Sequence, residues 1–346
     1  MNNRRRPTMK DVAKHARVSV STVSYVLNDS GPVAPERRER VLDAVRVLEY
    51  SPNESARSLK RRSASAIGLV VPDLTNQFFA LVAEGVQGAA IERGVLVVLC
   101  APQATGLPEG LHAKLLRSQR LDGVIYLTGT GALPTELLEL SRSGPVVLVD
   151  EQILGFDLPA VVCDSRRGAR EVATHVLAHG HRRIVVIGGP SAMWTGQQRL
   201  AGYREAFAGA GLDPDSVPVL VGDYRQDSGC ELARVALSGP PETRPTALVC
   251  ANDLMAIGAL EHCKAVGLRV PQDVSIVGFD DLPVSALLTP RLTTVRQPAR
   301  EMGAAAANRL LDLLAKPDGA PPAGEPVMLS TEVEIRDSVA PPPAGP

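Results

Sequence analysis

Short runs of apolar, mostly β-branched residues recur along most of this chain and alternate with stretches of helical periodicity. Such near-continuous apolar runs are typical of parallel strands that are buried on both faces. Nine runs are too many for one small sheet, and the alternation restarts after Asp164. We therefore predict two α/β lobes, each a parallel sheet covered by helices. The predicted strands are Ile67–Val71, Val95–Cys100, Gly123–Leu127, Val146–Val149, Ala160–Cys163, Ile184–Ile187, Val219–Val221, Ala247–Cys250 and Ser275–Val277.

Polar side chains follow several of these predicted strands. Asp150, the pair Asn252–Asp253 and the pair Asp280–Asp281 come just after apolar runs, and the segment Asp73–Phe79 follows the first run. In open α/β sheets, ligands bind beyond the carboxyl ends of the strands, and a cleft between two lobes suits a small molecule. Asn and Asp are also common helix caps, so capping alone would explain Asn252–Asp253 equally well.

The charges are distributed unevenly along the chain. Residues 1–62 carry 14 Lys and Arg against 7 Asp and Glu, whereas the whole chain has a net charge of −1. A basic segment on an acidic body is typical of a nucleic-acid-binding module attached to a regulatory domain, because phosphates are neutralised by cations gathered on one surface. A charge run in a solvated tail is the alternative.

Helical periodicity in the basic segment favours DNA binding. Thr8 and Asp11 have the spacing of a helix start, and Ser19 can cap a second helix. Pro35 opens a third helix, whose predicted apolar stripe is Val41, Leu42, Val45 and Leu48. Two short helices and a tight turn form a helix-turn-helix, in which the second helix enters the major groove. An ordinary three-helix bundle is the alternative.

Base recognition is expected at the start of the second helix. Val20, Ser21 and Tyr25 point away from the inward-facing Val23 and Val26 in the predicted helix. Side chains near the N-terminal end of a recognition helix reach the edges of the bases. We therefore expect Val20, Ser21 and Tyr25 to contact bases.

Three segments of the head, Met9–Lys14, Val18–Asn28 and Tyr50–Asn53, resemble the lactose-repressor (LacI/GalR) family of bacterial transcriptional regulators. The resemblance implies a hinge helix after the third helix, in which Leu59 wedges into the minor groove. A leucine among basic residues has no obvious core to join, which agrees with that role; packing on the body is the alternative. We assign to DNA binding Thr8, Ser19, Val20, Ser21, Thr22, Ser24, Tyr25, Asn28, Arg57, Leu59 and Lys60.

Two residues of the head depart from the family pattern. Arg17 stands where the family usually has the glycine of the helix-helix turn, so we expect a non-glycine residue with a positive φ. Tyr25 stands where many members have an arginine that reads a base. A tyrosine cannot form the bidentate contact of arginine with guanine, so we expect a different operator half-site.

The body resembles the periplasmic-binding-protein-like effector domain of the same family. The matching motifs are Asp73–Phe79, Gly180–Ile184, Arg199–Tyr203, Ala251–Ala256, Gly278–Asp281 and Leu292–Val295. Carboxylates and an arginine can bracket the hydroxyl groups of a sugar, while aromatic rings cover its apolar side. We expect a sugar-like effector, with a purine-like ligand as the alternative. The resemblance implies an effector site formed by Phe78, Phe79, Asp150, Thr195, Arg199, Tyr224, Asn252 and Asp280.

Several other classes of site have little support. The five cysteines are widely spaced, which argues against disulfides and a zinc cluster. His181 has no second ligand or nucleophile at a suitable spacing, so we interpret it as structural. Trp194, the single tryptophan, either stacks on the effector or lies partly buried on a lobe. We expect no catalytic residues, no metal site and no cofactor.

The predicted organisation is a helix-turn-helix head (1–53), a hinge helix and linker (54–65), a two-lobed effector and dimerisation domain (66–338) and a disordered tail (339–346). The tail lacks apolar heptads, which favours a homodimer on palindromic double-stranded DNA over a tetramer. No run is long and apolar enough for a membrane span or an export signal, so we expect a cytoplasmic protein. The predicted function is a ligand-responsive repressor of carbohydrate-metabolism genes. The alternatives are a metabolite-corepressed regulator and a sugar-binding or sugar-processing protein.

Overall fold

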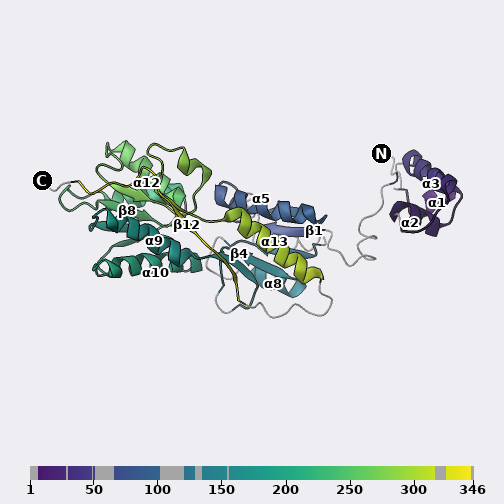
Figure 1. Ribbon diagram of the computed structural model, residues 1–346, viewed down its shortest axis with the longest axis horizontal. Helices are drawn as coiled ribbons and strands as arrows, with labels where there is room; N and C mark the ends of the chain where they lie inside the picture. Colours follow the sequence, from purple (N-terminus) through teal and green to yellow (C-terminus); the bar gives the residue numbers. More distant parts are fainter. Residues whose placement is uncertain are drawn as a thin grey trace. The chain divides into compact units, whose positions relative to one another are not determined.

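A computed structural model describes residues 7–28, 30–48, 50, 66–101, 121–128, 135–153, 156–315 and 325–343. The chain divides into two compact units, Met1–Ser63 and Ala64–Pro346. The described part of the first unit is helical, and that of the second unit forms two α/β lobes (Figure 1).

The first unit is a small three-helix module. Its helices are α1 (Met9–Ala16), α2 (Val20–Asn28) and α3 (Pro35–Val47). The centre of its core consists of side chains with no exposed surface, Val12, Val23, Val41 and Ala44. Tyr50 closes this core from the chain that follows α3. The predicted helix-turn-helix is confirmed.

Local chemistry sets the ends of these helices. Thr8 and Asp11 form a reciprocal capping box on α1, and the Ser19 hydroxyl accepts the Thr22 N–H at 3.1 Å at the start of α2. Arg17 ends α1 with φ 53° and ψ 49°, the left-handed conformation expected for the family's glycine position. Leu42 was wrongly predicted to face inward: it is 45% exposed, because Ala44 occupies the buried face beside Val41.

The first lobe is built on a six-stranded parallel sheet with the strand order β11-β5-β4-β3-β1-β2. The strands are β1 (Ala66–Val70), β2 (Leu96–Cys100), β3 (Gly123–Tyr126), β4 (Val146–Val149), β5 (Ala160–Cys163) and β11 (Val327–Leu329). Helices α5 (Gln77–Glu92) and α13 (Ala299–Ala315) pack on one face, while α8 (Thr135–Ser143) packs on the other.

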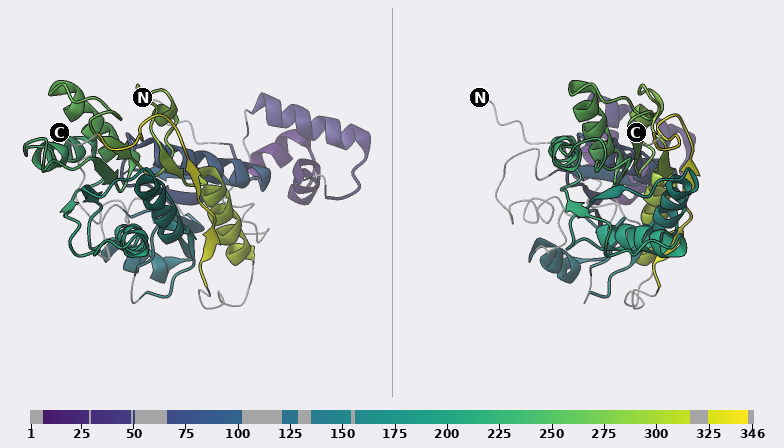
Figure 2. Two further views of the ribbon diagram at one scale, coloured as in Figure 1. Left: turned by 60° about the vertical axis from the view of Figure 1, so that its left-hand side comes forward. Right: turned by 90° about the vertical axis from the view of Figure 1, so that its left-hand side faces the viewer.

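The second lobe repeats this design on a four-stranded parallel sheet with the order β7-β6-β8-β9. The strands are β6 (Ile184–Gly188), β7 (Val219–Val221), β8 (Ala247–Cys250) and β9 (Ser275–Val277). One face is covered by α9 (Ser165–Ala178) and α10 (Trp194–Gly209), and the other by α11 (Gln226–Ala236) and α12 (Asp253–Ala265). A 3₁₀-helix, η1 (Pro283–Ala286), follows β9. Figure 2 shows these layers from two further sides.

The chain passes between the lobes three times, after β5, after β10 (Thr294–Arg296) and before β12 (Glu332–Glu334). Strands β10 and β12 pair antiparallel in a two-stranded sheet of their own. The first passage lies at the predicted restart after Asp164. The return of α13 and β11 to the first lobe was not predicted from the sequence.

The predicted α/β fold class is confirmed, and all nine predicted strands are present within two residues of their predicted ends. Strands β10, β11 and β12, of three residues each, were not predicted, and each pairs with a strand far away in the sequence. Val339 and Ala340, which we assigned to the tail, contact the second lobe: Val339 packs on its core and the Ala340 carbonyl accepts from His181 and Ser275. Among the described residues, no helix is both long and apolar enough to cross a membrane.

Candidate functional site

A cavity of about 110 Å³ lies between the two lobes. All of the residues predicted to bind an effector line it: Phe78, Phe79, Asp150, Thr195, Arg199, Tyr224, Asn252 and Asp280. They come together because each lies near the carboxyl end of a parallel strand or in the first turns of the helix that follows. Asp73 and Asn76, from the predicted segment Asp73–Phe79, also line it, as do Thr128, Met193 and Arg225, which we did not predict.

Arg199 is the buried cation of this cavity. It projects from α10 with 3% of its surface exposed, and its guanidinium group donates to the Ala251 carbonyl at 2.6 Å. The same group lies 4.0 Å from the centre of the Phe279 ring and 3.7 Å from Asp280 Oδ1. Burial opposes its charge, but the neighbouring Tyr224, Asp280 and Asp150 outweigh burial and raise the pKa of Arg199.

Two of the aspartates are acceptors placed in an apolar surrounding. Burial raises the pKa of both Asp150 and Asp280, and Arg199 partly opposes the shift. Asp150 Oδ1 and Arg199 Nε are buried without a hydrogen-bond partner among the residues that the structure describes. An unpartnered buried acceptor beside an unpartnered donor suits a ligand that supplies a complementary pair of polar groups.

The backbone is strained at the cavity. Asp150, Tyr224 and Asp280 have φ angles of 70°, 68° and 120°, in a region that residues with a side chain rarely adopt. Such conformations persist where the surrounding structure enforces them, and they are concentrated at functional sites. Here they turn three polar side chains toward one another at the ends of three different strands.

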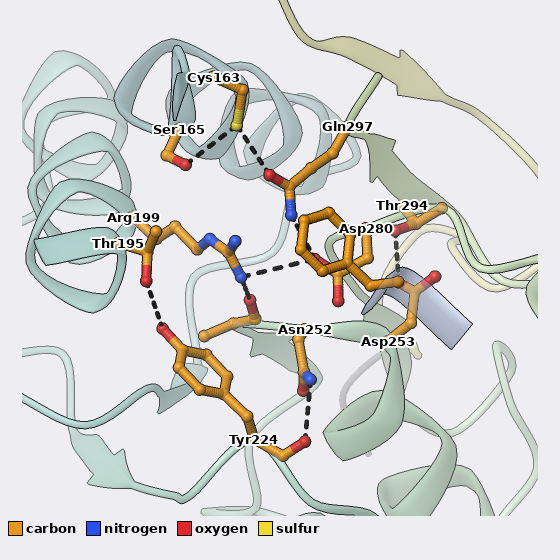
Figure 3. A network of polar contacts seen from close by, with 12 residues as sticks. Cys163, Ser165, Thr195, Arg199, Tyr224, Asn252, Asp253, Asp280, Thr294 and Gln297 are labelled. Carbon is orange, nitrogen blue, oxygen red and sulfur yellow. Dashed lines mark hydrogen bonds and ion pairs between the residues drawn. The ribbon is translucent and has the colours of Figure 1, made fainter. Parts of the chain in front are cut away.

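A hydrogen-bonded network connects Asp280 to the passages between the lobes (Figure 3). Burial raises the pKa of the Cys163 thiol to about 12, so this group stays protonated and donates a hydrogen bond to Gln297 Oε1 at 2.8 Å. With its oxygen engaged, Gln297 donates through Nε2 to Asp280 Oδ1 at 2.7 Å. Cys163 ends β5 and Gln297 follows β10, so two chain passages meet at one effector-site carboxylate.

The neighbours Asn252 and Asp253 differ in role. Asn252 Oδ1 caps α12 by accepting the Met255 N–H at 3.0 Å, while its Nδ2 donates to the Tyr224 carbonyl at the cavity. Asp253 does not line the cavity. Its two oxygens accept from the Leu282 N–H and from the hydroxyls of Ser285 and Thr294. Asp253 therefore fastens η1 and β10 to the start of α12.

Sequence reasoning missed Glu151, which comes directly after Asp150. Its carboxyl group is 2% exposed and accepts from the Trp194 N–H at 2.9 Å, from the Thr195 N–H and from the Thr195 hydroxyl. The Thr195 hydroxyl also lies 3.3 Å from the Tyr224 hydroxyl. No signal in the sequence distinguishes Glu151 from an exposed acid after a strand, because its partners lie on the other lobe.

His181 and Trp194 were also considered in the sequence analysis. His181 is fully buried, with Nδ1 at 2.9 Å from the Thr246 hydroxyl and Nε2 at 2.8 Å from the Ala340 carbonyl, which agrees with a structural role. Trp194 is half-buried and packs against the apolar cluster of the first lobe that contains Val124 and Tyr126. In the described parts of the chain, no group of three or more His, Cys, Asp or Glu residues is placed to hold a metal ion.

The predicted DNA-contacting residues fall into two groups. Val20 and Tyr25 are 42% and 48% exposed on α2, Ser21 is also exposed, and the Tyr25 ring packs close to Gly31. Thr8, Ser19 and Thr22 are engaged in helix caps, and Ser24 is half-buried. Arg57, Leu59, Lys60 and the side chain of Asn28 lie outside the described residues, as does the predicted hinge helix.

Basic side chains surround this helix-turn-helix. Lys10, Lys14 and Arg17 are exposed on and after α1, and Arg37 and Arg40 are exposed on α3. Exposed cations beside a helix with polar and aromatic surface residues are suited to phosphates flanking a major groove.

Comparisons with known proteins match both units. Residues 8–53 match bacterial regulatory proteins of the lacI family, and residues 173–339 match the periplasmic binding protein-like domain. The chain is 34% identical over 315 residues to the HTH-type transcriptional repressor PurR of Aliivibrio fischeri (strain MJ11), which covers 90% of this chain and 93% of that protein.

Two solved structures are similar over nearly the whole chain. A complex of the transcriptional regulator CelR with cellobiose has a TM-score of 0.72 and 34% identity, covering 96% of this chain and 100% of that one. The lac repressor dimer bound to operator and the anti-inducer ONPF has a TM-score of 0.81 and 26% identity, covering 97% of this chain and 100% of that one.

Proposed function

This chain belongs to the lacI family of bacterial regulatory proteins, and we propose that it is a repressor whose affinity for operator DNA is switched by a small effector bound between its lobes. The observation that carries the proposal is the cavity in which Asp150 Oδ1 and Arg199 Nε are buried and have no hydrogen-bond partner within the described parts of the chain. Effector binding and operator binding are then coupled reciprocally. In this proposed role the protein acts on DNA in the cytoplasm and catalyses no reaction.

The proposed effector is a sugar. Asp150 and Asp280 accept from hydroxyl groups, Arg199 donates to a ring or hydroxyl oxygen, and Phe78 and Phe79 cover an apolar face. The similarity to a cellobiose complex supports this class. A purine-like ligand that acts as a corepressor is the second candidate, since its polar edge and flat ring would use the same acceptors and aromatics.

A ligand screen followed by DNA binding tests the effector site. The purified full-length protein is screened by thermal shift against sugars, sugar acids, sugar phosphates and purines. A ligand at a hundredfold excess over its Kd stabilises the protein by about 2.7 kcal/mol. Asp280→Asn should abolish the shift, whereas Asp227→Asn, which changes an exposed acid on α11, should retain it. A ligand that binds both variants equally would contradict the proposed site.

We propose that α2 reads bases through Val20, Ser21 and Tyr25, while Leu59 in the segment 54–65 bends the DNA at the minor groove. Selection from random DNA should enrich a palindrome, and Tyr25→Ala should relax one position of each half-site. Leu42→Ala, on the exposed side of α3, is the matched control. Leu59→Ala should weaken specific binding more than non-specific binding; an equal loss of both would contradict the wedge.

We propose that the chain acts as a homodimer that matches the palindrome. The edge strand β2 exposes Leu96 and Leu99, with 65% and 47% of their surface accessible, and such an edge favours association. Sedimentation of Leu96→Lys should report a monomer with weakened operator binding. The rival class, a sugar-processing enzyme or sugar-binding receptor, predicts instead that no selected DNA binds at low salt.

A further inference from the structure

Glu151 joins the two lobes at one point. It follows β4 in the first lobe, and its carboxyl group binds the first turn of α10 in the second lobe. The N-cap residue of α10, Met193, makes no side-chain capping bond, so Glu151 serves as the cap from the opposite lobe. A carboxyl group is well suited to this position, because the first N–H groups of a helix are unpaired and partly positive.

A second contact crosses the same junction in the opposite direction. The side chain of Trp194, the first residue of α10, packs against the apolar cluster of the first lobe that includes Val124, Tyr126 and Ile153. Its own N–H donates to Glu151 at 2.9 Å. Because each lobe inserts a group into the other at this junction, separating the lobes breaks both contacts together.

The charges around Glu151 are unbalanced. Asp150 lies beside it, with Oδ1 buried and unpartnered among the described residues. Arg199 on α10 is the cation that faces both acids, and Tyr224 approaches through Thr195. Burial and the charge of Asp150 raise the pKa of Glu151 from its ordinary value of 4.5 to about 7, although the Thr195 hydrogen bonds and Arg199 oppose the shift.

We propose that Glu151 and the first turn of α10 form a proton-linked latch between the lobes: closing the lobes buries the Glu151 carboxyl group with uptake of a proton, so the closed form weakens as the pH rises. In the separated lobes the carboxyl group is hydrated and ionised at neutral pH. In the closed form it holds the proton and still accepts the Trp194 N–H at Oε2. The hydrogen bond that the ionised carboxylate accepts from the Thr195 hydroxyl then reverses, so that Glu151 is the donor.

The direction of the effect follows from linkage. An acid whose pKa is higher in the closed form stabilises that form fully below the lower of its two pKa values, and this contribution is lost progressively as the pH rises to the higher one. A rise of the pKa from 4.5 to about 7 shifts the closure equilibrium by up to about 300-fold between acidic and alkaline conditions. If effector binding requires lobe closure, as the proposed function implies, effector affinity falls over the same range.

The single tryptophan gives a direct measurement without DNA or effector. We would measure acrylamide quenching of Trp194 fluorescence in the full-length protein between about pH 4.5 and about pH 8. Quenching in the wild type should increase as the pH rises from about 4.5 towards about 7 and should level off above it. Glu151→Gln, which resembles the protonated acid, should remain protected at every pH. Glu151→Ala, which lacks the latch, should be accessible at every pH.

The control is Glu205→Gln, which removes the partner of Arg166 on α9 from the same helix as Trp194 and should behave like the wild type. Far-UV circular dichroism checks that each variant is folded. A wild-type signal that does not change with pH, or a transition that persists in Glu151→Gln, would overturn the proposal. Because the measurement contains neither DNA nor effector, its failure would leave the proposed repressor function untouched.

Discussion

Asp253 differs from the pair Asp150 and Asp280 in how fully its carboxylate is paired. Asp253 has partners for both oxygens in Leu282, Ser285 and Thr294. Asp150 and Asp280 share one arginine, and Asp150 Oδ1 has no partner among the described residues. A fully paired acid holds a fold together, whereas an incompletely paired one leaves room for a ligand.

The same division extends to the backbone. Asp150 and Asp280, at the cavity, have positive φ angles, whereas Asp253 begins a regular helix behind the Asn252 cap. Strain and missing partners coincide at the cavity and are both absent at Asp253. Stability and ligand binding should therefore respond in opposite ways when the two groups are changed.

The largest expected effect is on stability, from Asp253→Ala. This change leaves three buried donors without an acceptor and should lower the free energy of unfolding of the body by about 4 kcal/mol. Urea unfolding followed by Trp194 fluorescence measures it. Asp253→Asn keeps the shape and one acceptor, so it should cost about half as much. A loss below about 1 kcal/mol for Asp253→Ala would show that the pairing is not structural.

The second prediction concerns Asp150→Asn, which should weaken effector binding without lowering stability, in contrast to Asp253→Ala. It removes a charge that burial disfavours, so the free energy of unfolding should stay constant or rise by up to about 1 kcal/mol. Affinity for the effector found in the screen should fall about a hundredfold, because a charge-assisted hydrogen bond is lost. Calorimetric titration and urea unfolding of the same preparation measure both quantities. Destabilisation together with unchanged affinity would reverse the distinction between the two groups.

The third prediction concerns His181, a neutral group that is fully paired. Burial lowers the pKa of His181 below its ordinary value of 6.5, although the bond to the Ala340 carbonyl opposes the shift. The folded form therefore resists protonation, and stability should fall as the pH drops below 6.5. His181→Gln should cost about 2 kcal/mol at neutral pH and remove this part of the pH dependence. An unchanged difference between pH 7.5 and pH 5.5 would place the titration on His175 or His262.

Much of the fold could be predicted because each buried strand is a run of apolar residues that is visible in its own segment of the sequence. The runs that became β1 and β3–β6 are buried at nearly every position, and each was visible without knowledge of its neighbours. The short strands β10–β12 depend on partners far away in the sequence, so no local pattern indicated them. Leu42 was misplaced because helical spacing alone did not decide between Leu42 and Ala44 for the buried face.

The cavity was predictable to the extent that it follows strand ends. Asp150, Asn252 and Asp280 each come after an apolar run, whereas Thr195 and Arg199 were assigned from the resemblance. Glu151 and Gln297 escaped notice because their roles depend on contacts between elements far apart in the chain, Glu151 with α10 and Gln297 with Cys163 and Asp280. Hydrogen bonds between elements far apart in the chain leave no pattern in the residues next to Glu151 or Gln297 in the sequence.

The smallest expected effect is in the head, where Arg17 has a positive φ at the end of α1. Arg17→Gly should remove the steric cost of the left-handed conformation, but the extra freedom of glycine in the unfolded chain offsets part of that gain. The net stabilisation should be about 0.5 kcal/mol, which corresponds to roughly twofold slower amide exchange in α1 and α2 of the full-length protein. Arg17→Ala, which keeps a Cβ, should show no gain. If Arg17→Gly instead leaves exchange unchanged and weakens binding to the selected operator, the strain at Arg17 belongs with the strain at the cavity, and its side chain contributes to DNA recognition.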